Sequence, residues 1–339
     1  MAPASTLEPV LAYANEHLCR CERFAGHSYA EHGREVAEIL QEVIAHPPLL
    51  RAAVLHDLWA HPEAERLLRE SPLTDDEQAL VRAWREQTTP LRCDDARSTI
   101  DWPVPLRHSI DPRLHILLAA HHINDIRHLE RFSAGERRWI GTCALREAAL
   151  GMRALHVHRW AAEVEECCLN ELQPLAARTL REQAAMMQAS DHRCLEHMAQ
   201  RIGQLLVAEG IPHELECRQK GLYSTYRKMQ LTGKPFDQIL DRLGIRILAP
   251  DIPACYRVLR VLHRHYLFTW EEFGDFIRAP KQNGYQSLHT LLLSPPEDGG
   301  LAVEIQIRTQ EMHWRNIYGP ARHTFYKWVR YDGVTPALA

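Results

Sequence analysis

The chain has 339 residues, of which 45% are hydrophobic and 25% are charged, and its formal net charge is −4. This is the composition of an ordinary soluble protein, long enough for two domains that each bury a core. We find no apolar run long enough to cross a membrane and no signal peptide, and the charge is too weak to indicate DNA binding. The nine cysteines form no CxxC pair, which argues against structural zinc and disulfides and favours a reducing cytoplasm.

The first 175 residues are expected to be almost wholly helical. Apolar residues recur at three- and four-residue spacing in 32–44 and 48–57. The pair His56-Asp57 stands at the end of the second of these segments, and His32 lies upstream. A histidine and an aspartate side by side can both face a metal at a helix end, although many such pairs are ordinary surface or core residues. We expect a hinge between Pro174 and His192.

A helical rhythm continues at residues 218–228. Leu222, Tyr226 and Met229 can share an apolar face. The polar residues of this segment are spaced so that four cations would gather around a serine on another face, an arrangement suited to binding a polyphosphate. They are Arg218, Lys220, Ser224, Arg227 and Lys228. The alternative interpretation is a solvated charged face.

Two acids come next, each beside a strand-like run. Asp241 precedes the run 243–249, and Glu304 lies within the run 301–309. In the second run, period-two alternation places Glu304, Gln306 and Arg308 on one face. Two carboxylates that converge from separate strands could hold Mg²⁺, which prefers oxygen ligands and substrate phosphates. The alternative is a pair of unrelated surface acids.

The segment 273–289 is the most informative part of the chain. Its last nine residues include a cation, an amide, an aromatic ring and an imidazole, namely Lys281, Asn283, Tyr285 and His289. Pro280 and Gly284 indicate an irregular loop, and a strand is expected after it. Tyrosine can stack on a base and lysine can meet a phosphate, so the loop is suited to a nucleotide. An ordinary polar turn is the alternative.

Together these segments resemble a known family. Residues from about 195 to 330 are similar to the synthetase domain of the RelA/SpoT family, which makes the alarmones pppGpp and ppGpp. Five blocks carry the resemblance in the family's order: RQKGLYSTYRKM (218–229), FDQILDRLGIRIL (236–248), APKQNGYQSLHT (279–290), VEIQIRTQEMH (303–313) and YGPARHTFYK (318–327).

The resemblance implies a pyrophosphokinase that moves the β,γ-pyrophosphate of ATP to the 3′-hydroxyl of GDP or GTP. It implies that Asp241 and Glu304 are catalytic and bind Mg²⁺, and that the five polar residues of 218–228 bind ATP. The acceptor nucleotide would be bound by a larger set, with Tyr285 stacked on guanine: Lys281, Asn283, Tyr285, His289, Gln306, His323 and Lys327. The segment 272–275 is of the acidic type but has Gly274 where an acid or lysine is usual, which leaves the acceptor preference open.

The first half resembles the family's HD-type alarmone hydrolase. The implied metal ligands are His32, His56, Asp57 and His121, where His121 replaces an aspartate; they could hold Mn²⁺ or another transition metal. Ala60 and His61 stand where active relatives carry a Glu-Asp pair that handles the attacking water. Without that acid–base assistance we expect no hydrolysis, and we favour a relic site in a regulatory domain.

We therefore expect an α+β protein with an all-helical HD-type domain (1–175), a helical linker (176–194), a mixed-sheet nucleotidyltransferase-like synthetase domain (195–330) and a tail (331–339). Its partners would be ATP and GDP or GTP, with no membrane or DNA, and direct ribosome binding is not implied. Three alternatives remain: a phosphohydrolase centred on His32, His56 and Asp57, a synthetase with an adenine-nucleotide or tRNA acceptor, and an alarmone-binding regulator. The sequence leaves the regulatory trigger and the oligomeric state open.

Overall fold

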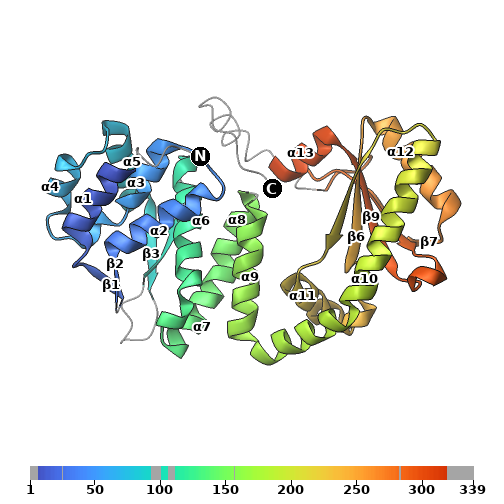
Figure 1. The fold of residues 1–339 in the computed structure, drawn as a ribbon, viewed down its shortest axis with the longest axis horizontal. Coiled ribbons are helices and arrows are strands. Elements are labelled where there is room, and N and C mark those ends of the chain that lie inside the picture. The colour runs from blue at the N-terminus through green and yellow to red at the C-terminus, as the bar shows by residue number, and fades with distance from the viewer. Residues whose placement is uncertain are drawn as a thin grey trace. The chain divides into compact units, whose positions relative to one another are not determined.

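The computed structural model describes residues 7–24, 26–92, 101–105, 111–155, 157–281 and 284–318. Contacts divide the chain into two compact units that meet in the sequence at Leu172 and Gln173 (Figure 1). The domain limits expected from the sequence remain predictions, and the expected tail lies outside the described residues. Among the helices described, none combines the length and apolar character that a membrane span requires.

The first unit is mainly helical, as expected, and also contains two small antiparallel hairpins that the sequence did not indicate. The hairpins pair β1 with β2 and β3 with β4. Their bounds are β1 Glu22–Phe24, β2 His27–Ser28, β3 Thr88–Arg92 and β4 Asp101–Pro105. The helices are α1 Glu8–Leu18, α2 Tyr29–Gln41, α3 Pro47–Val54, α4 Ala64–Glu70, α5 Asp75–Gln87, α6 Pro112–Arg127, α7 Ala134–Cys143, α8 Ala149–Ala154 and α9 His158–Leu172.

Helices α2 and α3 cross closely at a glycine. Ser28 begins α2 with a capping box, in which its hydroxyl accepts from the backbone N–H of Glu31 and the Glu31 carboxylate accepts from the backbone N–H of Ser28. Further along α2, a Cβ added to Gly33 would collide with the backbone carbonyl of Val54 at the end of α3. The crossing places His32, on α2, close to His56, which follows α3.

The second unit is built on a five-stranded mixed sheet of order β5-β6-β9-β8-β7, in which only the central pair β6–β9 is parallel. The strands are β5 Glu214–Gln219, β6 Leu243–Ala249, β7 Phe268–Asp275, β8 Leu288–Leu293 and β9 Ala302–Thr309. The helices are α10 Pro174–Ala208, α11 Leu222–Thr232, α12 Ile252–His265 and α13 Gln310–Tyr318. With the helical first unit, this gives an α+β fold. Residues 176–194 lie within α10, a single continuous helix.

The strands predicted beside Asp241, around Glu304 and after the loop at 281–287 are confirmed as β6, β9 and β8. The helix predicted over 218–228 is wrong in its first part, because Arg218 lies in β5 and the helix begins only at Leu222. Arg218 pairs with Gly244 of β6, so its conformation is set by a partner strand some 25 residues away rather than by local periodicity.

The two faces of the sheet differ in character. Alternate residues of β6 and β9, such as Ile245 and Ile305, point to one face of the sheet. There they form the core with apolar side chains of α10 and α12, such as Val258. Figure 1 shows these two helices along the same side of the sheet. The opposite face carries polar residues and remains partly open. That face holds the candidate site.

Candidate functional site

The strand register gathers polar side chains in rows on the open face. Directly paired residues of neighbouring strands share a face. One row therefore contains Arg218, Gly244 and Glu304 from β5, β6 and β9. The next row contains Arg246, Gln306 and His289 from β6, β9 and β8. Glu304 and Gln306 lie on one face of β9, as the alternation predicts, and the sheet register adds His289 beside Gln306.

Asp241 lies two residues before β6 and faces the same cavity as Glu304. A cavity of about 170 Å³ is lined by residues of β5, β6 and β9 and their flanks: Arg218, Lys220, Asp241, Arg242, Gly244, Glu304 and Gln306. The two predicted acids therefore converge on one cavity. Gly244, which faces it, leaves room because it has no side chain.

The Asp241 carboxylate has one engaged and one free oxygen. The Nζ atoms of Lys220 and Lys228 each lie 2.7 Å from Oδ2. Burial raises the pKa of Asp241, but the hydrogen bonds from these two lysines outweigh burial, so its pKa is below the usual value. Oδ1 is buried and has no hydrogen-bond partner among the described residues. An ionised carboxylate with a free buried oxygen is suited to a cation.

Glu304 is held by a chain of hydrogen bonds. His289 Nδ1 lies 3.1 Å from Oε1, and Gln306 Nε2 donates to Oε2 at 2.8 Å. Burial raises the pKa of Glu304, but the hydrogen bond from His289 leads the opposing contributions, and the net pKa is below the usual value. Because the ionised carboxylate only accepts, His289 carries its proton on Nδ1, and its Nε2 accepts from the Tyr285 hydroxyl at 2.7 Å.

The predicted ATP-binding residues come from three elements. Arg218 reaches the cavity from β5, Lys220 from the turn after β5 and Lys228 from α11. Ser224 and Arg227 also lie on α11, where Ser224 is half-buried and Arg227 is exposed. The lysines are the members of the group that contact Asp241 directly.

The ring of Tyr285, which the sequence predicts to stack on a base, has two cations close to it. Lys281 Nζ lies 5.3 Å from the centroid of the Tyr285 ring, and the Arg308 guanidinium lies 5.7 Å from it. Arg308 is buried, which lowers its pKa to about 10. The sequence placed Arg308 on the correct face but did not identify it as a site residue. The remaining predicted acceptor residues, Asn283, His323 and Lys327, lie outside the described residues.

The acidic segment before the loop is used partly for structure. Asp275 accepts from the Tyr256 hydroxyl of α12, at 3.0 Å for its Oδ2, and from the backbone N–H of Arg278. At position 274 a side chain would collide with the Phe276 ring unless that ring moved. The departure from the family at Gly274 therefore has a local steric reason.

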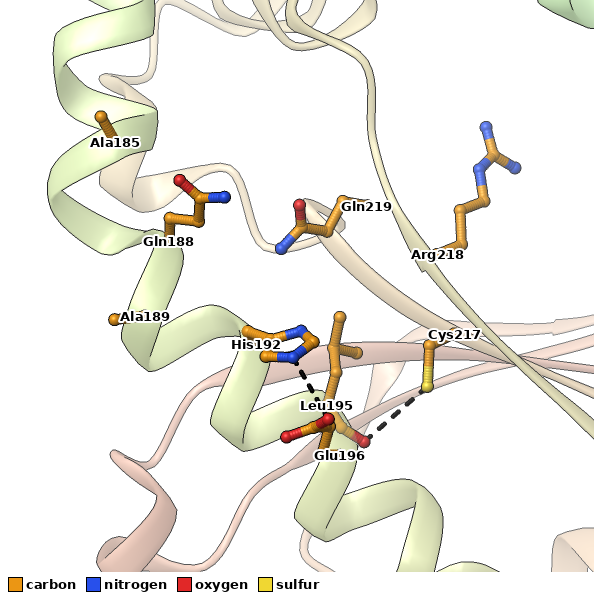
Figure 2. Close-up of a pocket in the computed structure, with 9 residues that line it drawn as sticks. All are labelled: Ala185, Gln188, Ala189, His192, Leu195, Glu196, Cys217, Arg218 and Gln219. Carbon is orange, nitrogen blue, oxygen red and sulfur yellow. Dashed lines mark hydrogen bonds and ion pairs between the residues drawn. The ribbon is translucent and has the colours of Figure 1, made fainter.

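A larger cavity of about 650 Å³ lies on the other side of β5, against α10. Figure 2 shows Cys217 and Gln219 on the α10 side of the strand, while the side chain of Arg218 extends away from the helix. The Cys217 thiol points to the backbone oxygen of Leu195 at 3.9 Å. Arg218 thus lines both cavities, and strand alternation directs its side chain toward the acids.

The first unit brings its four predicted metal ligands together. One ligand atom from each of His32, His56, Asp57 and His121 lies within 4.8 Å of the others. His56 Nδ1 donates to the backbone oxygen of Ala53 at 2.6 Å, and His32 Nδ1 donates to Asn124 Oδ1 at 2.8 Å. Both Nε2 lone pairs therefore face the cluster, as in metal sites.

His121 fits a metal less well. Arg23 Nη2 lies 3.1 Å from His121 Nε2, and because an arginine only donates, this nitrogen must accept. The His121 proton is then on Nδ1, which points at His32 Nε2 and His56 Nε2 at 3.2 and 3.0 Å. That N–H occupies the direction in which a metal ligand would offer a lone pair.

Residues 60 and 61 do not replace the Glu-Asp pair that handles the attacking water in active relatives. Ala60 carries no acid–base group, and the His61 ring accepts from the backbone N–H of Glu63. Three of the four ligands are arranged as for a metal, and His121 could join them only by moving its proton.

Known proteins are similar to this chain in sequence. Residues 217–330 match the protein family described as "Region found in RelA / SpoT proteins". Over 312 residues, or 90% of this chain, the sequence is 30% identical to the "Bifunctional (p)ppGpp synthase/hydrolase SpoT" of Escherichia coli (strain K12). The chain belongs to the RelA/SpoT family.

Other relatives match about half of the chain. The "GTP pyrophosphokinase" of Escherichia coli (strain K12) is 36% identical over 165 residues, which cover 49% of this chain. The match spans 22% of the length of that protein and 43% of the length of the SpoT protein, which is less than half of either. A structure of the small alarmone synthetase 1 from Bacillus subtilis matches 45% of this chain and 81% of its own, with 21% identity and a TM-score of 0.36.

Proposed function

We propose that the second unit transfers the β,γ-pyrophosphate of ATP to the 3′-hydroxyl of GDP or GTP and releases AMP. The observation that carries this proposal is the convergence of Asp241 and Glu304 on one cavity, beside Lys220, Lys228 and Arg218. The names of the two Escherichia coli relatives support the same reaction.

Asp241 and Glu304 are proposed to hold Mg²⁺. The donor set is of oxygen atoms, as this ion prefers, and the buried Asp241 Oδ1 is free to bind it. Bound there, the ion would neutralise charge on the transferred phosphates. In the first unit, the cluster of His32, His56, Asp57 and His121 could hold a transition metal such as Mn²⁺ through all four ligands only with the His121 tautomer changed.

The remaining site residues would position the two nucleotides and neutralise the negative charge of the phosphates. Lys220, Lys228 and Arg218 would bind the ATP phosphates, where phosphoryl transfer needs spreading negative charge to be stabilised. A bond forms between the acceptor 3′-oxygen and the β-phosphorus, and the bond from that phosphorus to the α,β-bridging oxygen breaks. The bridging oxygen leaves with AMP. Glu304, ionised and fixed by His289, would accept the proton of the attacking hydroxyl.

Tyr285 would stack on the acceptor base, with Lys281 and Arg308 close to its ring. Stacking is compatible with any base, so guanine over adenine is the part of the proposal that rests on the relatives. Both nucleotides are those of the cytoplasm, which is where we propose that the protein acts.

An acceptor assay tests the function. The protein would be incubated with γ-labelled ATP, Mg²⁺ and, separately, GMP, GDP, GTP, ADP, ATP or tRNA. We expect labelled ppGpp from GDP and pppGpp from GTP. In Asp241→Asn and Glu304→Gln, turnover should fall by roughly 100-fold or more, on the scale of lost charge-stabilising groups.

Glu311→Gln is the matched control, since Glu311 is an exposed carboxylate on α13 and forms a local ion pair with Arg315. Its turnover should equal that of the wild type. No labelled product with any acceptor, or normal turnover in folded Glu304→Gln, would refute the proposal.

We also propose that the first unit does not hydrolyse alarmones. The support is Ala60, which carries no acid–base group, His61, whose Nδ1 already accepts from the backbone N–H of Glu63, and the proton of His121 directed into the cluster. Labelled ppGpp incubated with Mn²⁺ should release no pyrophosphate. Appreciable release would make the chain bifunctional.

A further inference from the structure

A second group of metal-ligating side chains lies in the first unit, apart from the four residues already described. His27 comes from β2, Glu35 from α2 and His128 from the end of α6. His27 Nε2 lies 3.1 Å from Glu35 Oε2, and His128 Nε2 lies 3.5 Å from the same oxygen. We propose that these three residues bind a divalent transition-metal ion, through two imidazoles and one carboxylate.

The tautomer of His128 points to this role. Its Nδ1 lies 2.9 Å from the backbone oxygen of Asn124, which can only accept, so Nδ1 is the donor. The Nε2 atom of a neutral His128 then directs a lone pair at the Glu35 carboxylate. A lone pair facing an anion is repelled, whereas a cation between them would be bound by both. A histidine that donates its other N–H to a backbone carbonyl is the usual arrangement of a metal ligand.

His27 adds an independent observation. Its side chain is 3% exposed, and its Nδ1 has no hydrogen-bond partner within the part of the chain that the structure describes. No described residue therefore fixes the tautomer of this ring by a hydrogen bond at Nδ1, and its Nε2 can present a lone pair to an ion beside Glu35. The stack of the His27 ring on Phe24, with centroids 4.6 Å apart, holds the ring so that Nε2 faces Glu35.

The site is open enough to admit an ion. The side chains of Glu35 and His128 are 22% and 16% exposed, so coordination positions beyond the three protein ligands can be filled by water. Three protein ligands with a vacant position is the pattern of catalytic rather than structural zinc sites.

Asn124 connects the two groups without belonging to either set of ligands. Its Oδ1 accepts from His32 Nδ1 at 2.8 Å, and its Nδ2 donates to Glu35 Oε2 at 2.7 Å. The first group has the Arg23 cation 3.1 Å from His121, which opposes a second positive charge there. A metal ion should therefore bind first at His27, Glu35 and His128.

Zn²⁺ titration of the metal-free full chain by calorimetry tests the site, with Co²⁺ absorption as the spectroscopic probe. A competing chelator removes weak binding by exposed histidines. We expect tight binding of about one ion per chain, and at least a tenfold loss of affinity in His128→Gln. His56→Gln, the matched control in the neighbouring group, should retain the affinity of the wild type. Circular dichroism would show that both variants are folded.

Two outcomes would overturn the proposal. One is undiminished Zn²⁺ affinity in His128→Gln. The other is a loss of affinity in His56→Gln that equals or exceeds the loss in His128→Gln, which would place the ion in the first group. Melting supplies a second readout, because a ligand that binds only the folded state raises the unfolding temperature. That increase should vanish in His128→Gln and persist in His56→Gln.

Discussion

At the scale of single residues, Tyr285 contributes two groups with separate contacts, its aromatic ring and its hydroxyl. Its ring is flanked by Lys281 and Arg308, while its hydroxyl donates to His289, which in turn donates to Glu304. The sequence identified the ring as a stacking surface. The hydrogen-bond chain from the same residue to the proposed base was not foreseeable, because it depends on the separation between neighbouring strands.

Two substitutions separate these roles. Tyr285→Ala removes the ring, so the acceptor KM should rise roughly tenfold or more, since base–aromatic stacking contributes about 1–3 kcal/mol. Tyr285→Phe keeps the ring and loses the hydroxyl, so KM should stay nearly constant while kcat falls several-fold as His289 loses its partner. Steady-state kinetics with GDP and GTP provide the measurement. Equal increases of KM in both variants would show that the hydroxyl, not stacking, binds the acceptor.

At the scale of secondary-structure elements, the crossing of α2 and α3 depends on one glycine. Gly33 lies inside α2, where glycine is normally unfavourable, and it is retained because the backbone of Val54 occupies the space of a side chain. The same crossing brings His32 and His56 together. A helix propensity scale alone would recommend alanine here, and it would do so wrongly.

Gly33→Ala should therefore destabilise the first unit by roughly 1–3 kcal/mol, the usual cost of overpacking. Gly151→Ala, within α8, is the matched control, because a Cβ there would meet nothing within 4 Å. This control should be neutral or stabilising by up to about 1 kcal/mol, as the helix propensities predict. Urea unfolding followed by circular dichroism measures both. Equal stability of the two variants would mean that the helices separate without cost.

At the scale of the whole molecule, each unit buries a histidine in neutral form. Burial, followed by the charge of Arg23, lowers the pKa of His32 in the first unit to about 4. Burial and then Arg308 and Arg246 lower the pKa of His313 in the second unit to about 4 as well. An unfolded histidine titrates near 6.5. Between these values the unfolded chain binds protons that the folded chain does not.

Stability should consequently fall as the pH is lowered from about 6.5 to about 4, and it should not depend on these histidines above that window. The free energy of unfolding, measured by urea titration at intervals of pH, is the readout. His313→Gln should reduce the slope, because glutamine does not titrate. A stability that is constant or rises between pH 6.5 and 4, or an unchanged slope in the variant, would contradict the burial of neutral histidine.

The sequence by itself determined the strands beside Asp241 and around Glu304, the helical first half and the family. These follow from local periodicity and from residue order, which a chain carries without folding. The four side chains of the first unit that the resemblance named as metal ligands do lie together in the fold.

Tertiary structure decided what depends on distant partners. Arg218 is in a strand because β6 pairs with it, and Asp241 is held by two lysines that only folding brings to it. The group of His27, Glu35 and His128 joins a hairpin and two helices, so no spacing in the sequence marks it. The physical reason is the same in each case: periodicity sets which face a side chain takes, whereas register and helix crossings set what it meets.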